Sequence, residues 1–526
     1  MRSLSDNIGK YLQNLNKSFN KIKPEIWLIF IIIFALIIRL HFFVGMNLND
    51  DLCYLNSAYD ITQGEFTLNE WIFSPRIMMH YPIAFFYAIF GISDFSGALY
   101  ILLCSLGNVA VAYFIGKTLF NSKVGLMSAF LMSFFPIEVL FGTTIVPDPP
   151  VAFFMGLSVC LFLMGEKKNK IFFYILAGLA IGLAWLVKSL AILIILFYLS
   201  YFLFDKIFGF KYLISGIKQE KYTSRIRNIF SIRKGFILTA LGFLLVLFLE
   251  GMLYFITNNN FFLRFKIETS HYTSSLMGCN FNLDFYPRML FAQTSSYFDY
   301  FGVFFVIFGA CVFLLILFEK NKKYIILVIW ALSILLWMQY GTMNPFEYVP
   351  MHRLYRFLTV ITIPISVTIG YFIVGSKVNK KKILNIGNVI IISALIITSF
   401  SSISMGHFYM DQSMIDFREI ADFLKDHPSK DIYVDEDTRG KLDFLLSYKR
   451  TENLRLLNQV KNSSDIKDAF VIVNSSRGFV EDDWLRSQLP DFIYNPPENW
   501  EIAKIVTSAY IGFYRFYDPV IYYVPP

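Results

Sequence analysis

Residues 171–205 read IFFYILAGLAIGLAWLVKSLAILIILFYLSYFLFD, with Lys188 as the only lysine. A helix needs about 20 mostly apolar residues to cross the hydrocarbon core of a membrane. The stretch is therefore long enough for two spans, 171–188 and 189–205. Two adjacent spans predict a polytopic α-helical membrane protein.

Nine further segments meet the same criterion, which predicts about 11 transmembrane helices in all. They are 26–45, 95–116, 124–144, 149–165, 235–256, 297–318, 324–341, 354–375 and 383–404. No small-residue cleavage site follows the first of them, so we interpret it as a retained anchor and not as a signal peptide.

The composition divides the chain near residue 410. Overall it is 56% hydrophobic and 16% charged, against roughly 25% charged in soluble proteins. Residues 411–526 carry 14 Lys and Arg and 20 Asp and Glu, which leaves 33 and 19 for the first 410 residues. These numbers exclude a single soluble domain, a disordered chain and a nucleic-acid binder with a basic face. We predict a tail at 1–25, a transmembrane domain at 26–405 and a soluble domain at 406–526.

The distribution of Lys and Arg predicts the orientation, because these residues stay on the cytoplasmic side in short loops. The N-terminal tail and every second loop hold 25 of them, whereas the opposite loops hold only Arg76, Arg264, Lys266 and Arg288. With an odd number of spans, the N-terminal tail is predicted to be cytoplasmic and the C-terminal domain extracytoplasmic. The membrane would be the cell membrane or, in a eukaryote, that of the endoplasmic reticulum.

The C-terminal domain reads as alternating helices and strands. Helices are predicted at 414–425 and 440–447, and strands at 431–434, 469–473, 500–506 and 510–517, which indicates a small α/β domain. Elsewhere, Cys53 and Cys279 are both predicted outside, where a disulfide between them is permitted. The sequence contains no nucleotide-binding loop, zinc-ligand spacing or Gly-x-Ser-x-Gly motif.

Three carboxylates at the outer edge of the membrane are the first candidates for function, because ionisable groups there are costly to keep. Asp50 and Asp51 begin the stretch 50–62, whose apolar stripe predicts a helix on the membrane surface, within the outer loop 46–94. Asp148 lies between two spans in a proline-rich turn. Asp51 and Asp148 could instead serve as helix caps, and both alternatives remain open at this point.

Three residues near the same outer edge are candidates for binding an anion. Lys188 either snorkels to the interface or binds the anion. Arg353 and Arg356 run against the positive-inside trend and offer bidentate donors to a phosphate, with interfacial anchoring by Tyr355 as the alternative. Carboxylates and cations without a nucleotide loop fit chemistry on a lipid phosphate that has crossed the bilayer. A carboxylate would act as general base on an acceptor hydroxyl, and the cations would stabilise the departing phosphate.

Several short motifs, in a consistent order, carry a family resemblance over most of residues 25–375. They are Asp50-Asp51 with Tyr54, His80-Tyr81-Pro82, Gly116–Phe120, Asp148, Gly178–Lys188 and Arg356-Phe357-Leu358. Together they resemble the GT-C superfold of membrane glycosyltransferases, in particular the dolichyl-phosphate-mannose–protein mannosyltransferases and the bacterial lipid A aminoarabinose transferase. The sequence departs from these families at Asp51, which replaces a glutamate, at Tyr81, which replaces a lysine, and at Phe357, which replaces a tyrosine.

The resemblance implies an inverting glycosyltransferase that moves a hexose or pentose from a polyprenyl or dolichyl phosphate to a protein, glycan or lipid acceptor outside. Asp50 would be the general base, and Asp51 and Asp148 would position the acceptor or a divalent metal ion, the one cofactor left open. The implied substrate contacts are Lys188, Arg353, Tyr355, Arg356, His80 and Tyr54. No nucleic-acid partner is implied.

A transporter or flippase of a lipid-linked saccharide is the alternative function. It predicts charged residues at the middle of the bilayer and broken helices in matching halves of the chain. The charges here lie mostly at the ends of the predicted spans, which favours the transferase.

Overall fold

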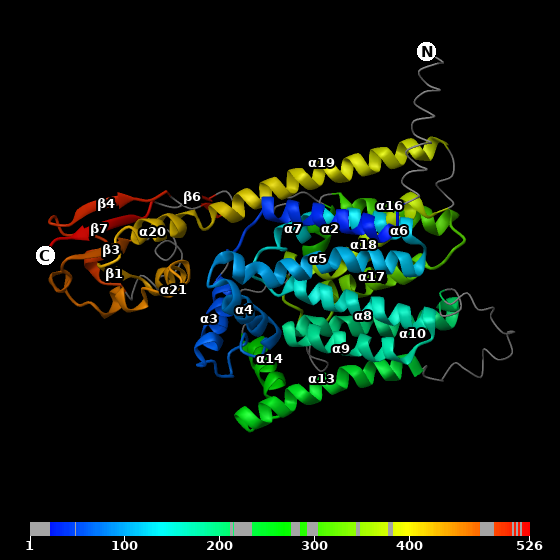
Figure 1. Cartoon of the computed structure of the whole chain (residues 1–526), viewed down its shortest axis with the longest axis horizontal. Coiled ribbons are helices and arrows are strands. Elements are labelled where there is room, and N and C mark those ends of the chain that lie inside the picture. Colours follow the sequence, from blue (N-terminus) through cyan, green and yellow to red (C-terminus); the bar gives the residue numbers. More distant parts are fainter. Residues whose placement is uncertain are drawn as a thin grey trace, which may run out of the picture.

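The computed structural model describes residues 22–47, 49–210, 214, 234–274, 284–291, 303–342, 348–376, 382–473, 489–507, 510–511, 514–515 and 518–526. Most of these residues form a bundle of apolar helices, and a small sheet-containing domain lies at one end of it (Figure 1). The predicted fold class, a polytopic helical membrane protein with a small C-terminal α/β domain, is confirmed.

Each of the eleven predicted spans contains at least one helix. These helices are α2 (Pro24–His41), α5 (Asp94–Leu119), α6 (Ser122–Ser133), α7 (Pro136–Leu140), α8 (Asp148–Lys168), α9 (Ile171–Val187), η1 (Ser189–Leu193), α10 (Ile194–Phe208), α13 (Lys234–Asn258), α16 (Phe304–Phe318), α17 (Tyr324–Tyr340), η2 (Tyr355–Ile361), α18 (Thr362–Val374) and α19 (Lys382–Gln412).

Six helices in the described part of the chain are long and apolar enough to cross a membrane. They are Pro24–His41, Asp94–Leu119, Asp148–Lys168, Lys234–Asn258, Tyr355–Val374 and Gly387–Gln412. Five further apolar helices have 10–17 residues. The chain is therefore an integral membrane protein by composition, while the predicted number of eleven spans is not established helix by helix.

Two parts of the bundle differ from the sequence prediction. The segment 124–144 forms two helices, α6 and α7, because Pro136 starts α7 at a position where a proline cannot continue the preceding helix. The outer loop 46–94 contains, besides α3 (Asn49–Gln63), the apolar helix α4 (Ile77–Phe90). Its 14 residues are fewer than a membrane span needs, so a search for spans passes over it.

Glycines allow close helix packing where α9 crosses α13. A Cβ atom on Gly178 would lie 2.0 Å from the carbonyl oxygen of Thr239, and one on Gly242 would lie 2.5 Å from that of Ile175. Only glycine fits at these two positions, which is the usual way for membrane helices to approach closely.

A buried polar network joins α2, α5, α7 and α18. The Nε of Arg39 donates to the Oγ of Ser105 at 2.8 Å, and that hydroxyl donates to the carbonyl of Glu138 at 3.0 Å. The carboxylate of Glu138 in turn accepts from Asn108 at 3.1 Å and from Thr362 at 2.7 Å. Because buried polar groups are costly when unpaired, these bonds fix the relative positions of α2, α5, α7 and α18.

The C-terminal domain is built on a five-stranded mixed sheet with the order β2-β1-β3-β7-β4. The strands are β1 (Asp431–Val434), β2 (Leu454–Leu456), β3 (Ala469–Val473), β4 (Glu501–Ile505) and β7 (Val520–Val524). β1 pairs in parallel with β2 and β3, and β7 pairs antiparallel with β3 and β4. Helices α20 (Ile415–Lys425) and α21 (Glu436–Leu445) bury residues with those of the sheet in one hydrophobic cluster.

Some predicted elements of this domain needed correction. α21 begins four residues before the predicted 440, because the side chain of Asp435 accepts a hydrogen bond from the Thr438 amide and caps the helix there. In place of one strand at 510–517, the structure has the short strands β5 (Tyr510–Ile511) and β6 (Tyr514–Arg515), which pair with each other. Strands β2 and β7 were not predicted.

Candidate active site

The helix α3 begins beside the outer end of the first span. Its two acidic residues, Asp50 and Asp51, lie in different surroundings. The Oδ2 of Asp51 accepts a hydrogen bond from the Asn47 amide at 2.8 Å, and its side chain is fully buried. The side chain of Asp50 is 39% exposed and forms an ion pair with Arg356. Asp51 therefore fixes the start of the helix, while Asp50 is the acidic side chain of this pair that solvent reaches.

Asp148 lies at the first position of α8 but does not cap that helix with its side chain. Its carboxylate is 0% exposed and lies between two cations, with Oδ1 3.0 Å from the Nζ of Lys188 and Oδ2 3.4 Å from the Nε of Arg356. A buried carboxylate requires such partners, because desolvation of an unpaired charge costs several kcal/mol or more. Asp148 thus connects the two cations.

Lys188 takes its position from the end of α9. The helix stops at Val187, and Lys188 has an extended backbone before η1 begins. Besides the Asp148 carboxylate, its ammonium contacts the face of the Phe357 ring, 4.0 Å from the centroid. The side chain is buried within the protein, so the snorkelling alternative does not describe it.

Arg356 joins Asp50 and Asp148, although 306 residues separate it from Asp50. Its Nη2 donates to the Oδ2 of Asp50 at 2.6 Å. Burial raises the pKa of the Asp50 carboxyl, but the positive charges of Arg356, Arg76 and Lys188 lower it more, so the net pKa lies below its usual value. Asp50 is therefore ionised at neutral pH.

Arg76 is a member of this cluster that the sequence prediction missed. Its Nη1 donates to the hydroxyl of Tyr54, and its guanidinium lies over the Phe73 ring, 4.6 Å from the centroid. It also lies close enough to Asp50 to lower the pKa of that carboxyl. The sequence did contain one signal, because Arg76 is among the few basic residues of the predicted outer loops. A basic residue there indicates that a neighbouring group compensates its positive charge.

Of the remaining predicted site residues, Tyr54 and His80 lie near Arg76, whereas Arg353 and Tyr355 contact residues outside this cluster. The ring of His80 is buried, lies 5.7 Å from the Tyr54 ring, and donates from Nε2 to the Phe73 carbonyl at 2.9 Å. Arg353 donates to the carbonyl of Gln339 at 2.7 Å, and the Tyr355 ring lies 5.7 Å from that of Phe141. Cys279, for which a disulfide with Cys53 is permitted by the predicted topology, lies outside the described residues.

The sequence prediction named Asp51 and Asp148 as possible metal positions, and Asp51 accepts a hydrogen bond from the Asn47 amide. Asp50 and Asp148 do not suit a divalent metal ion as they are placed. Within the described ranges, no group of three or more His, Cys, Asp and Glu side chains is arranged to hold a metal. Both carboxylates instead bind the cationic side chains of Lys188 and Arg356. A second cation at the same oxygens would have to displace these partners against their positive charge.

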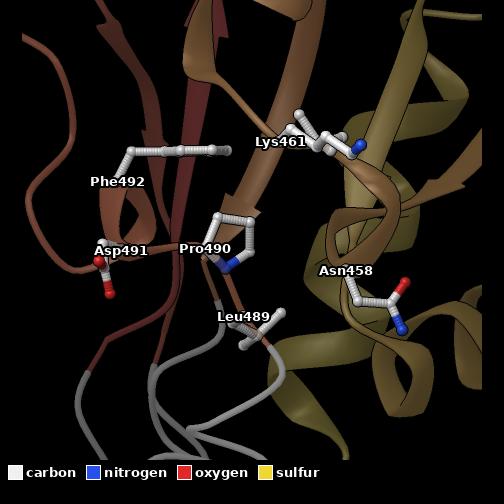
Figure 2. Close-up of a pocket in the computed structure, with 7 residues that line it drawn as sticks. Asn458, Lys461, Leu489, Pro490, Asp491 and Phe492 are labelled. Carbon is white, nitrogen blue, oxygen red and sulfur yellow. The ribbon is translucent and has the colours of Figure 1, made fainter.

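A separate pocket lies within the C-terminal domain. Figure 2 shows Asn458, Lys461, Leu489, Pro490 and Phe492 around it. All of its lining residues belong to that domain, so it is distinct from the cluster around Asp50 and includes no predicted site residue.

Comparison with solved structures identifies the architecture. ArnT from Cupriavidus metallidurans, in complex with undecaprenyl phosphate, matches 94% of this chain and 97% of its own, with a TM-score of 0.59 and 12% identity. The chain has the GT-C fold of membrane glycosyltransferases. The apo oligosaccharyltransferase from Archaeoglobus fulgidus also matches, over 86% of this chain and 70% of its own, with a TM-score of 0.50 and 11% identity.

Comparison with models of protein families gives a match over part of the sequence. The model of the dolichyl-phosphate-mannose-protein mannosyltransferase family matches residues 74–214. That range includes Arg76, His80, Asp148 and Lys188 but neither Asp50 nor Arg356. No individual curated protein matches the sequence.

Proposed function

We propose that this GT-C protein is an inverting glycosyltransferase that moves a sugar from a polyprenyl or dolichyl phosphate to an acceptor on the outer face of the membrane. The observation that carries the proposal is the cluster of Asp50, Arg356, Asp148 and Lys188, which combines one solvent-accessible carboxylate with two buried cations. The family model that matches residues 74–214, and the solved complex of ArnT with undecaprenyl phosphate, support a lipid-linked donor.

Asp50 is the general base in this proposal. Its carboxylate is ionised, reaches solvent and lies beside the cations, whereas the carboxylate of Asp148 is enclosed. Asp50 takes the proton of the acceptor hydroxyl while that oxygen attacks the anomeric carbon. The bond from the anomeric carbon to the phosphate oxygen breaks in the same step, so the product has the anomeric configuration opposite to that of the donor.

Arg356 and Lys188 hold the donor phosphate and stabilise the charge that develops on it as it leaves. Asp148 keeps both cations in place, and Arg76 adds a further positive charge near Asp50. Arg353, which binds the Gln339 carbonyl, supports the outer start of η2. The Tyr54 hydroxyl accepts a hydrogen bond from Arg76, and the His80 ring packs near the Tyr54 ring, so both residues support Arg76.

An assay with a panel of lipid-phosphate sugars tests the proposal. Purified protein is incubated with polyprenyl and dolichyl phosphates that carry mannose, another hexose or a pentose, together with protein, glycan and lipid acceptors. We expect transfer from at least one donor, with inversion in the product by NMR and turnover about 10²–10⁴-fold lower in Asp50→Asn. Transport of an intact lipid-linked saccharide across vesicles, without transfer, would instead support the flippase.

We further propose that residues 1–25 lie in the cytoplasm and the C-terminal domain outside. The excess of Lys and Arg in the tail and in alternate loops supports this orientation. In Figure 1, α3 and α4 lie at the same end of the bundle as the C-terminal domain. Single cysteines at Ser57 and Asn458 should therefore react with the same impermeant reagent applied from outside, and protection of either one would contradict the orientation.

A further inference from the structure

The helix α3 lies between the ion-pair cluster and the C-terminal domain. At 100° per residue, Asp50 and Tyr54 lie on one side of this helix, and Leu52, Asn56 and Tyr59 lie on the opposite side. The first side contacts Arg356 and Arg76. The second side is the one that the C-terminal domain covers, so contacts made there reach the proposed base through a single helix.

Tyr448, which follows α21, makes the main contact with the second side of α3. Its ring stacks on that of Tyr59 with centroids 3.9 Å apart and 10° between the planes. Its hydroxyl donates to the Oδ1 of Asn56 at 2.5 Å. One turn of α3 is therefore held both by aromatic stacking and by a hydrogen bond.

The backbone around Tyr448 adopts a conformation that side-chain-bearing residues rarely take. Ser447 and Tyr448 both have φ of 55°, in the left-handed region. Such residues persist where surrounding contacts hold them, and they concentrate at functional positions. Here the two consecutive left-handed residues follow the end of α21 at Leu445, where the Tyr448 ring meets α3, and the Ser447 hydroxyl donates to the Ile92 carbonyl between α4 and α5 at 3.1 Å.

The segment that leads into α3 is held from the same direction. The side-chain amide of Asn47 donates to the Met410 carbonyl at the end of α19, at 2.5 Å. Arg418, in α20, donates to the Val44 carbonyl at 2.9 Å. The backbone amide of Asn47 then binds Asp51. The C-terminal part of the chain thus holds both the segment that precedes α3 and the second side of that helix.

We propose that the C-terminal domain holds the helix that carries the general base, and that Tyr448 is the positioning residue that does so through Tyr59 and Asn56. This inference rests on the proposed glycosyltransferase function. The proposed donor phosphate contacts lie elsewhere, with Lys188 between α9 and η1 and Arg356 in η2. Loss of the Tyr448 contact should therefore displace Asp50 and lower kcat while the KM for the lipid donor changes little.

Four variants test the positioning role. Tyr448→Ala removes the stacked ring and the hydroxyl, and a misplacement of about 1 Å can cost about a hundredfold in rate, so we expect kcat to fall tenfold or more. The KM for the donor should stay within about twofold. Tyr448→Phe keeps the ring and should retain kcat within about threefold. Val471→Ala, in β3, removes buried apolar contacts of the C-terminal sheet without touching α3 and should retain full kcat. If Tyr448→Ala does not fold, Tyr448→Leu replaces it.

Hydrogen exchange supplies a readout that does not depend on activity. Amides of residues 50–62 should exchange faster in Tyr448→Ala than in the wild type, while those of α5 should not change. Unchanged exchange in α3, unchanged kcat in Tyr448→Ala, or an equal loss of kcat in Val471→Ala would overturn the positioning role. If the wild-type protein transfers no sugar from any donor, the proposed function fails, and the exchange measurement alone decides whether Tyr448 holds α3.

Discussion

Substitution of Asp50 and Asp148 by asparagine should separate the two carboxylates of the cluster, because their surroundings differ. Asp50 is 39% exposed and loses one solvent-screened ion pair, which contributes about 0.2–1 kcal/mol to the free energy of unfolding. Arg356 retains Asp148 as its second carboxylate. Asp148 is fully buried between Lys188 and Arg356. Its neutralisation leaves two buried cations and should cost about 3–5 kcal/mol.

Asp50→Asn and Asp148→Asn should also differ in their effects on catalysis. Asp50→Asn keeps the shape of the side chain but cannot accept a proton, so we expect turnover to fall by about 10²–10⁴-fold with little change in donor binding. Asp148→Asn should lose both stability and donor binding, because it releases Lys188 and Arg356, the cations proposed to hold the phosphate. The measurements are turnover with a radiolabelled donor, donor affinity, and thermal unfolding of the detergent-solubilised protein.

Three results would each refute part of this reasoning. Near-normal turnover of Asp50→Asn would remove Asp50 as the base, and a product that retains the anomeric configuration of the donor would exclude the single displacement. Equal destabilisation by Asp50→Asn and Asp148→Asn would show that exposure does not distinguish the two ion pairs.

The pH dependence of the rate should reflect the pair between Asp50 and Arg356. Because the pKa of Asp50 is lowered, its basic form persists as the pH falls, and kcat/KM should stay level from neutrality to about pH 5, above the ordinary Asp pKa of about 3.9. Arg356→Gln removes the lowering charge and should move the acidic limb of the pH–rate profile to higher pH; an unmoved limb would mean that another group titrates. Separately, Glu250→Gln breaks a buried ion pair with Arg264 and should cost about 3–5 kcal/mol in the free energy of unfolding. Glu25→Gln breaks an exposed pair and should leave the free energy of unfolding in denaturant titrations nearly unchanged, and equal losses would contradict the difference in burial.

The spans could be predicted from the sequence because apolar length alone signals them. Every predicted span contains a helix, and the errors occur where a local feature interrupts the pattern. Pro136 breaks 124–144 into two helices, and α4 is too short to register as a span. In the C-terminal domain, β2 has only three residues, too few for alternation to show, and it is defined by its pairing with β1.

The sequence singled out four residues that the structure joins by ion pairs, but it did not predict which of them pair. Asp50, Asp148, Lys188 and Arg356 are ionisable groups at the ends of apolar helices, which is enough to single them out. That Arg356 binds Asp50 across 306 residues depends on how the helices pack, and no local pattern reports this. Arg76 was noticed only as one of the few outer charges. The contact of Tyr448 with α3 joins two domains and also has no signature in the sequence.

The resting cluster carries two negative and two positive charges in Asp50, Asp148, Lys188 and Arg356, and this balance bears on the order of events in the proposed reaction. A lipid-linked donor brings a phosphate whose negative charge competes with Asp50 for Arg356. The phosphate therefore weakens the ion pair that lowers the pKa of Asp50, and the base becomes stronger once the donor is bound. Since kcat/KM reports the free enzyme and kcat the substrate complex, we expect the acidic limb of kcat to lie at higher pH than that of kcat/KM for the donor. In Arg356→Gln, where no such competition exists, the two limbs should coincide. Coincident limbs in the wild type would show that the phosphate binds without drawing Arg356 from Asp50, and would leave Lys188 as its principal contact.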